Sequence, residues 1–569
     1  MVQEKWVALS NTTIGVLMAT INASILIISL PPIFRGIDLN PFQHGAFAYL
    51  LWILMGYMIV TSVILVTIGR LSDMLGRVRF FNFGFAIFTL GSILLYLTPG
   101  KGDTGALELI LFRVVQAVGG SFLMANSYAI ITDNFPAKER GFALGINAIA
   151  GTAGMSLGIL IGGVLSAINW RYVFLVSVPV GILGTVWSFL KLKETSPRIK
   201  QKIDIPGNIT FAAGLIILLI GITYGIVPYK SYSNGWSNPY VIAALVIGAA
   251  LLIAFPFIER KVQNPMFRLE LFKIRAFTAG SLSGMISGMG MMGLMFMIIL
   301  LFQAIWLPIH GYSYASAPFW AGIFMLPMTL AMGIFGPISG KLSDKYGSRG
   351  IATMGLTISA VALILMVLLP YDFNYIYMAL LLFMFGSGMG MFTAPNTSAV
   401  MSSVPAETRG SASGMLNTMR NVGNTASMGI FFTILILGLT SILPHTITTA
   451  LNTAGASKLA PYMASLPPTD AIFGAFLGIN PVKVILSVLP TSVVSSIPSS
   501  AIATITARSW FPGIFAPAFM KSLHDVFIIA FIITIVAVLL SLFRSPLNLR
   551  TGSKQAKNVN LIKYDKLKK

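Results

Sequence analysis

GRLSDMLGRVR at residues 69–79 and GKLSDKYGSRG at residues 340–350 are two copies of one motif, placed 271 residues apart. A second pair, PAKERGFALG at 136–145 and PAETRGSASG at 405–414, repeats at an offset of 269 residues. Two unrelated motifs that recur at nearly the same offset indicate a chain built from duplicated halves. The sequence between the motifs then decides what kind of halves these are.

The composition is that of an integral membrane protein. Of the 569 residues, 56% are hydrophobic and 10% are charged, and the mean hydropathy is +0.84, whereas soluble proteins carry about 25% charged residues. Uncharged apolar stretches of about 20 residues can cross a bilayer as a helix. Fourteen spans are predicted, at 7–31, 46–68, 80–98, 107–131, 142–166, 172–190, 205–227, 239–258, 277–303, 319–339, 351–370, 375–399, 411–438 and 524–543.

The positive charges lie between these spans and predict the orientation of the chain. With the N-terminus inside, 28 of the 38 Lys and Arg residues fall in cytoplasmic segments and 8 in external segments. This bias predicts that both termini are cytoplasmic, and it accounts for the net charge of +21 without a nucleic-acid partner. Both copies of the first motif then lie on the cytoplasmic side, so the halves are parallel repeats, which in transporters enclose a substrate site between them.

The offset of about 270 residues exceeds what six spans with short loops need. Two uncharged runs, 209–227 and 240–258, account for the excess as two additional crossings, with a re-entrant hairpin as the alternative. The predicted domains are a six-helix bundle (1–190), a central linker with two extra transmembrane helices (191–276), a second six-helix bundle (277–543) that includes a long external loop (439–523), and a basic cytoplasmic tail (544–569).

The sequence contains few of the residue patterns that bind cofactors or catalyse reactions. There is no cysteine, and the four histidines lie far apart without ligand spacing, so we expect neither a metal site nor another cofactor. No nucleophile–base pair or phosphate-binding loop is evident. A membrane enzyme or sensor is therefore the disfavoured alternative, and we expect no enzymatic activity.

The paired GxLSDxxG loops resemble the cytoplasmic loop signature of the major facilitator superfamily. The extra central hairpin resembles its fourteen-span drug/proton antiporter branch, of the multidrug efflux type. Branch patterns of the first, fourth, fifth and sixth spans are similar to NASILIISLP (22–31), RVVQAVGG (113–120), GMSLGILIGG (154–163) and WRYVFLVSVPVG (170–181). The resemblance implies an all-α, major-facilitator-like fold in the cell (cytoplasmic) membrane and solute transport by alternating access.

The resemblance assigns a gating role to the two loops. In the family the loop aspartate, here Asp73, latches the halves against the helix that begins near Ser411, and Arg77 pairs with an acid that corresponds to Asp133. The second half retains an aspartate but has serines at the two positions equivalent to this pair. A generic polar turn is the alternative. The expected gating residues are Gly69, Asp73, Gly76, Arg77, Asp133, Gly340, Asp344 and Gly347.

Arg113 is predicted to lie roughly 9 Å inside the fourth span. A charge at the bilayer centre costs about 2.5–3.5 kcal/mol on insertion scales, so such a residue faces a cavity or a partner. Gln116 lies on the same helical face. In the family this arginine serves in proton coupling, often near a first-span aspartate, and the matching position here is Asn22. A snorkelling or structurally bonded arginine is the alternative.

Span 13 carries polar residues at steps of three and four, which place them on one helical face. Because a polar stripe facing lipid would be costly, we expect it to face the interior, with polar contacts between helices as the alternative. Together with the residues around Arg113, the expected substrate cavity consists of Asn22, Arg113, Gln116, Asn417, Arg420, Asn421 and Asn424.

Glycines at four-residue steps in the fifth span predict close helix packing. In the antiporter branch a proline follows the middle glycine of this motif, whereas this chain has Ile159, a departure that weakens the inference of antiport. The expected packing residues are Gly154, Gly158, Gly162 and Gly163.

The energy source is the least determined part of the sequence. None of the 17 carboxylates is predicted deep in a span, and Asn22 cannot titrate. The candidate proton sites are therefore Glu108, His524 and Asp525.

We expect a secondary active exporter of small amphipathic or drug-like compounds, by proton antiport if the family pattern holds. The alternative is a uniporter or importer of an organic anion bound by buried arginines. The expected partners are the small-molecule substrate, the lipid bilayer and protons, and we expect a monomer.

Overall fold

A computed structural model describes residues 2–43, 45–136, 139–194, 204–230, 232, 234–262, 265, 267–405 and 408–543. Within these residues the protein is all-α, apart from one isolated β-bridge between Tyr229 and Tyr232. The predicted basic tail 544–569 lies outside the described residues.

The fourteen predicted spans are confirmed, because fourteen helices in the described residues are long and apolar enough to cross a membrane. The spans of the first half and the central hairpin are α1 (Val2–Gly36), α2 (Ala46–Leu75), α3 (Arg77–Leu97), α4 (Gly102–Asn134), α5 (Arg140–Ile168), α6 with α7 (Tyr172–Leu175 and Ser177–Lys191), α8 (Ile205–Ile226) and α9 (Pro239–Glu259).

The spans of the second half follow a short 3-10 helix, η1 (Leu269–Lys273). One of them, α10, continues through a π-helical turn, η2 (Leu301–Trp306), into α11 (Leu307–Ile309). The spans are α10 (Arg275–Leu300), α12 with α13 (Ala317–Phe324 and Leu326–Tyr346), α14 (Ser348–Met366), α15 (Tyr375–Ser402), α16 (Arg409–Thr453) and α22 (Trp510–Leu542).

The two signature motifs form equivalent turns. Gly76 separates α2 from α3 with φ +115°, and Gly347 separates α13 from α14 with φ +87°. Backbone of this kind is readily adopted by glycine alone. In both copies the glycine N–H donates to a serine carbonyl four residues earlier, from Gly76 to Ser72 and from Gly347 to Ser343. The duplication in the sequence is therefore also a duplication of local structure.

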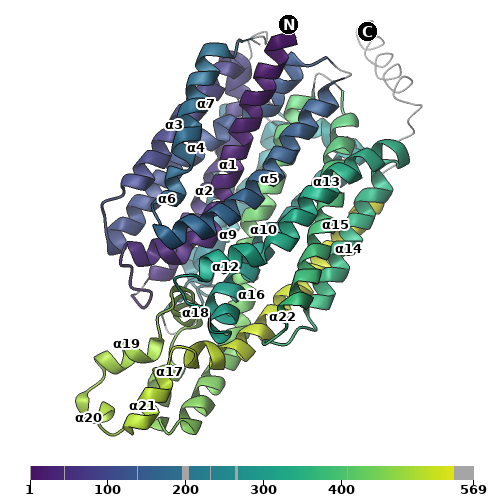
Figure 1. Cartoon of the computed structure of the whole chain (residues 1–569). Helices are drawn as coiled ribbons and strands as arrows, with labels where there is room; N and C mark the ends of the chain where they lie inside the picture. Colours follow the sequence, from purple (N-terminus) through teal and green to yellow (C-terminus); the bar gives the residue numbers. More distant parts are fainter. Residues whose placement is uncertain are drawn as a thin grey trace, which may run out of the picture.

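Helices α1–α7 gather on one side of the molecule, and α10–α16 with α22 gather on the other (Figure 1). Across the junction, α2 packs against α16, and α5 packs against α12 and α13. The central hairpin covers one seam of this junction, because α8 contacts both α2 and α16. At 1.5 Å per residue its two helices, of 22 and 21 residues, are each roughly 32 Å long, which suits two full crossings.

The predicted external loop 439–523 is shorter in the structure, and much of it is helical. Helix α16 has 45 residues, roughly 68 Å, so it continues well past the expected membrane exit at 438. Similarly, α22 begins at Trp510 rather than at 524. Hydropathy marks where a helix leaves the apolar layer, and Ser- and Thr-containing turns extend it beyond that point. Between the two helices lie η4 (Ser457–Leu459), α17 (Ala460–Ala464), α18 (Pro468–Leu477), α19 (Pro481–Val488), α20 (Thr491–Val494) and α21 (Ser499–Ile505).

Candidate transport pathway and gating network

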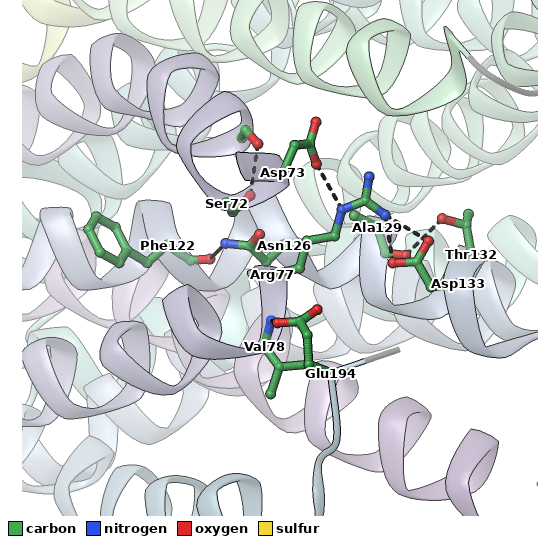
Figure 2. A network of polar contacts seen from close by, with 11 residues as sticks. Ser72, Asp73, Arg77, Val78, Phe122, Asn126, Ala129, Thr132, Asp133 and Glu194 are labelled. Carbon is green, nitrogen blue, oxygen red and sulfur yellow. Dashed lines mark hydrogen bonds and ion pairs between the residues drawn. The ribbon is translucent and has the colours of Figure 1, made fainter. Parts of the chain in front are cut away.

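Arg77 joins three helices at the predicted cytoplasmic end of the first half. Its Nε donates to Asp73 Oδ1 at 2.8 Å, across the Gly76 turn, and its Nη1 donates to both carboxylate oxygens of Asp133 at 2.6 and 2.7 Å. Figure 2 shows the guanidinium between the two carboxylates. The three side chains are 17–30% exposed, so this bridge is partly shielded from water. It ties the end of α2 and the start of α3 to the end of α4.

Glu194 adds a contact that the sequence did not suggest. This residue follows α7, and its Oε2 accepts the N–H of Val78 at 3.0 Å, near the start of α3 (Figure 2). A carboxylate at a helix N-terminus satisfies a backbone donor and stabilises the helix dipole. Oε2 also lies 2.7 Å from where a Cβ on Gly76 would be, so the turn needs glycine for space as well as for φ. The one feature of the sequence that could have pointed to this contact is that Glu194 is a lone acid between Lys193 and the cations that follow.

Among the described residues, Asp73 is bonded within the first half rather than to the second. The hydrogen bond described for Asp73 is with Arg77, and no bond from Asp73 reaches the start of α16 within the described residues. In the second copy, Ser348 and Ser402 replace the equivalents of Arg77 and Asp133. A serine hydroxyl donates to a glycine carbonyl three residues earlier in both copies, from Ser72 to Gly69 at 2.8 Å and from Ser343 to Gly340 at 2.7 Å. The side chain of Asp344 lies outside the described part.

Beside this turn, Arg70 joins α2 to the segment that precedes α10. Its Nη2 donates to the carbonyl of Pro265 at 2.6 Å. The gating turn is thus attached on one side to α4 and on the other to the linker between the halves.

Arg113 is the centre of a buried polar network in the first half. The side chain is 3% exposed, and its Nη1 donates to Asn22 Oδ1 of α1 and, at 2.6 Å, to Gln116 Oε1. Gln116 donates in turn to Ser92 of α3 at 2.8 Å, and Asn22 donates to Ser177 of α7 at 3.4 Å. Five side chains from four helices therefore form one chain of hydrogen bonds.

All these partners of Arg113 are neutral. The guanidinium lies over the ring of Tyr57 on α2, 4.3 Å from the centroid, a cation–π geometry. Among the described residues no carboxylate pairs with it, and neither Arg113 Nε nor the Tyr57 hydroxyl has a hydrogen-bond partner. A buried donor without a partner is costly. The network therefore retains positive charge and unused hydrogen-bonding capacity.

The polar stripe of α16 faces other helices rather than outward. A Cβ on Gly288 of α10 would lie 2.8 Å from Asn424 Oδ1 and 2.9 Å from the carbonyl of Arg420. Ser427 accepts the N–H of Gly293 at 3.1 Å. Tyr128 of α4, which belongs to the first half, lies close enough to Arg420 for the two groups to interact electrostatically. The remaining members, Asn417 and Asn421, are half-buried on the same stripe.

The two arginines lie at different depths. Arg420 is near Tyr128, which is 15 residues beyond Arg113 along α4, a rise of roughly 22 Å. The two arginines therefore lie beside different turns of α4.

The predicted packing glycines make close helix contacts. Side chains at Gly154, Gly158 and Gly162 would run into α1, at Thr20, Ser24 and Ile25 among other atoms. Gly163 faces the other way, and a Cβ there would lie 2.8 Å from the carbonyl of Pro318 on α12. The motif therefore joins α5 to its own bundle and, at one position, to the opposite half.

The three proposed proton sites make no hydrogen bond to the Arg113 network among the described residues. Glu108 accepts the N–H of Gly100 at 2.9 Å, which holds the loop between α3 and α4. His524 is half-buried with its Nε2 at 3.0 Å from the carbonyl of Leu369, and Asp525 is exposed. None of these contacts brings the three groups together.

Two enclosed acids at the base of the central hairpin escaped the sequence reasoning. Asp204 is 4% exposed and Glu259 is 1% exposed, although both stand at helix ends. Asp204 caps α8 by accepting the N–H of Gly207 at 2.8 Å, and Glu259 accepts the N–H of Phe267. The position of Asp204 just before an Ile–Pro helix start could have predicted the cap. The burial of the two acids could not have been predicted, because both lie where the sequence places the membrane surface.

Fourteen helices able to span a membrane among the described residues, a tight turn repeated at equivalent places and buried polar side chains inside the bundle are features of a membrane transporter. The chain belongs to the Major Facilitator Superfamily, whose sequence model matches residues 12–428.

Among curated proteins, the chain is similar to the riboflavin transporter RibZ of Clostridioides difficile (strain 630), with 30% identity over 76% of this chain and 89% of that protein. It is also similar to multidrug resistance protein 3 of Bacillus subtilis (strain 168), with 27% identity over 74% of this chain and 78% of the relative. The multidrug transporter protein MdtP of the same organism is 26% identical over 89% of this chain and 88% of its own length.

Solved structures share the fold at low sequence identity. A bacterial homologue of the human lysosomal transporter Spinster, in an inward-facing and occupied conformation, has a TM-score of 0.52 and 16% identity, covering 94% of this chain and 96% of its own. A D-xylose–proton symporter has a TM-score of 0.54 and 14% identity, covering 83% of this chain and 97% of its own.

Proposed function

We propose that the protein is a secondary active exporter that moves small amphipathic, drug-like compounds out of the cytoplasm across the cell membrane. The halves 1–190 and 277–543 would rock about a site that opens to either side in turn, with both termini in the cytoplasm and the protein acting as a monomer. The observation that carries the proposal is the buried Arg113 network, whose amide oxygens and aromatic face would offer polar and apolar contacts to one solute. The multidrug relatives support the substrate class.

The gating turn supports a rocking motion. The bridge from Arg77 to Asp73 and Asp133 makes the inner end of the first half one rigid unit. Asp73 shares Arg77 with Asp133, so it can exchange this partner for the N-terminus of α16 when the inner ends approach, because a helix N-terminus stabilises a nearby carboxylate. The residues proposed to gate are the ones predicted in the two loops.

The experiment is transport of a fluorescent cationic dye into inside-out vesicles with an imposed pH gradient. Proton antiport predicts that wild-type flux rises with the gradient and collapses with a protonophore. Asn22→Asp places a titratable group beside Arg113 and should steepen the dependence on pH. Asn22→Gln, which cannot titrate, is the matched control. Flux that ignores the gradient in wild-type vesicles would reject antiport, and no dye flux under any gradient would reject export.

A second candidate, transport of an organic anion, is favoured by the same guanidinium because its partners are all neutral. Arg113→Glu should then abolish uptake of an anionic dye and spare that of a cationic dye of equal size. Arg420→Glu is the comparison at the other depth. Equal loss of both dyes in Arg113→Glu would remove the anion hypothesis, since charge would not be what the residue recognises.

A further inference from the structure

Helix α18 is an apolar segment buried inside the outer part of the molecule. Its sequence, PTDAIFGAFL, contains one charged residue, Asp470, and the other nine residues are buried. A helix that is apolar all round requires an apolar environment on every side. In Figure 1 it lies at the end of the molecule opposite the N-terminus, between the helical bundles and the protruding helices α17 and α19–α21.

The surroundings of α18 come from both halves of the transporter. The ring of Phe473 lies 5.2 Å from that of Phe34 on α1 and 6.2 Å from that of Phe47 on α2. The ring of Phe476 lies 6.3 Å from that of Phe296 on α10. Phe432 of α16 completes an aromatic cluster, because its ring is 5.6 Å from Phe47 and 5.3 Å from Phe296. The helix thus fills the junction where α1 and α2 meet α10 and α16.

A polar clamp holds the end of α18 in place. Arg35, at the end of α1, donates to the carbonyl of Leu477 at 3.1 Å and to that of Tyr314 at 3.2 Å. Gly478 ends the helix with φ +74°, and a side chain there would run into the Tyr314 ring. Burial raises the pKa of Tyr314 to about 12, although Arg508 and Arg35 oppose the rise. The clamp therefore joins one half, the helix and the loop before α12 in a water-poor environment.

We propose that α18 is a plug that closes the predicted external mouth of the pathway and has to leave it once in every transport cycle. This inference rests on the proposed alternating access, because external opening would separate α1 and α2 from α10 and α16. The aromatic cluster and the Arg35 clamp span that separation. They would both break when the mouth opens.

The connections of α18 suit such a movement. Pro467 precedes the helix and Gly478 ends it, and α18 meets α19 at a bend of 112°. Beyond the bend, Asn480 donates to the carbonyl of Ile505 at 3.0 Å, which fixes α19 to α21. The outer helices thus give a frame from which α18 can swing without unfolding its neighbours.

The absence of cysteine from the chain permits a direct test in vesicles. The double variant Phe34→Cys/Phe473→Cys would be treated with a short, reducible bis-thiosulfonate cross-linker, which ties the plug to α1. The matched control is Phe302→Cys/Phe324→Cys, a buried aromatic pair 5.7 Å apart that lies within the second half. Dye transport is compared before cross-linking, after it, and after reduction.

Cross-linking the plug should reduce transport at least roughly tenfold, since closure of a gate stops the cycle, and reduction should restore it. The control pair should keep its rate when cross-linked. If the plug-linked protein transports as fast as its reduced form, the proposal is overturned while the proposed export stands.

A second readout separates failure of the plug from failure of the proposed function. If wild-type vesicles move none of the dyes, export is rejected, and the plug is judged by labelling F473C from the predicted external side with a membrane-impermeant maleimide. Labelling faster than that of the buried F324C control supports a plug that leaves the mouth. Labelling at the control rate shows that α18 is a permanent part of the core and overturns the proposal.

Discussion

The environment of Arg113 shows how a single charge is kept inside an apolar bundle with no counter-ion among the described residues. Two amide oxygens accept from the guanidinium and the Tyr57 ring covers its face. A desolvated cation–π contact contributes about 2 kcal/mol, which is comparable to the insertion cost of one arginine. The aromatic ring should therefore matter more than the hydroxyl that it carries.

This reasoning predicts different effects for two substitutions of Tyr57. Tyr57→Phe keeps the ring and removes a hydroxyl that has no partner among the described residues, so stability and transport should stay near wild type. Tyr57→Leu removes the ring and should lower stability by about 1–2 kcal/mol with a loss of transport. Thermal unfolding in detergent and dye uptake would measure both. A transport defect in Tyr57→Phe at normal stability would instead assign the hydroxyl to solute binding.

The bridge at Arg77 gives a second prediction, because the second half shows what the site looks like without it. Arg77→Ser removes the cation that Asp73 and Asp133 share, and Asp133→Ser removes one of the two carboxylates that hold Arg77, whereas the double variant reproduces the serines of the second half. Removing one member of a shielded ion pair costs more than removing both. The double variant should therefore be more stable than the sum of the single effects, by about 0.5–3 kcal/mol.

A double-mutant cycle of thermal stability in detergent would measure this coupling. Lys193→Ser with Glu4→Ser offers a matched control, since that pair is 3.3 Å apart but 75% and 41% exposed. Additive effects at Arg77 and Asp133 would mean that the bridge contributes no more than an exposed pair.

Sequence reasoning at the residue scale succeeded where a partner was set by the repeat or by helix periodicity. The contact of Arg113 with Gln116 was of this kind, whereas those of Arg77 with Asp133 and of Arg113 with Asn22 were expected from the resemblance to the major facilitator superfamily. Glu194 was missed because its contact with the start of α3 spans 116 residues and follows no local spacing. The depths of Arg113 and Arg420 also depend on how two helices are staggered, which neither helix encodes alone.

At the scale of elements, α5 shows how small residues set the distance between helices. Gly158 packs directly on α1, so a Cβ there would meet the backbone of Ile21 as well as Ser24. Gly145, on the same helix, is exposed, and among the described residues no atom beyond its chain neighbours and its own helix backbone lies within 4 Å of a Cβ position. The same change at these two positions should therefore have opposite effects.

Gly158→Ala should force α1 and α5 apart and destabilise the protein by about 1–3 kcal/mol. Gly145→Ala should be neutral or stabilise by about 0.5–1 kcal/mol, since alanine favours the helix without a clash. Thermal unfolding of both variants in the same detergent, together with dye uptake, is the measurement. Equal stability of the two variants would show that the α1–α5 contact yields without cost.

The spans could be predicted from sequence because each is an uncharged run with its own hydropathy. The ends of α16 and α22 could not, because helix continues outside the apolar layer with no change of hydropathy that marks its end. Helix α18 falls within the predicted external loop 439–523. Its burial depends on Phe34, Phe47 and Phe296, which lie far away in the sequence. A short apolar run has the same sequence pattern whether it is buried between the halves or lies at the membrane surface.

At the scale of the whole molecule, the central hairpin is bound unequally to the two halves. It is hydrogen-bonded to α2, through Thr67 and Asn208 at 2.5 Å and through Thr223 and Met55 at 3.6 Å. Helix α8 also packs on α16, with Ile222 against Gly429, but no hydrogen bond between the hairpin and α16 is found among the described residues. Directional hydrogen bonds resist sliding, whereas apolar contacts can be exchanged along a helix surface. The hairpin should therefore move with the first half while the second half slides past it.

Spin labels on three exposed positions of the cysteine-free chain test this motion. Tyr240→Cys marks the hairpin, Leu107→Cys the first half and Tyr377→Cys the second, and the native side chains are 82%, 55% and 63% exposed. Pulsed dipolar distances are measured with and without transported dye. The distance from hairpin to first half should stay constant, and that from hairpin to second half should shift. The reverse pattern would place the hairpin with the second half, because the apolar seam with α16 would then hold more firmly than the hydrogen bonds to α2.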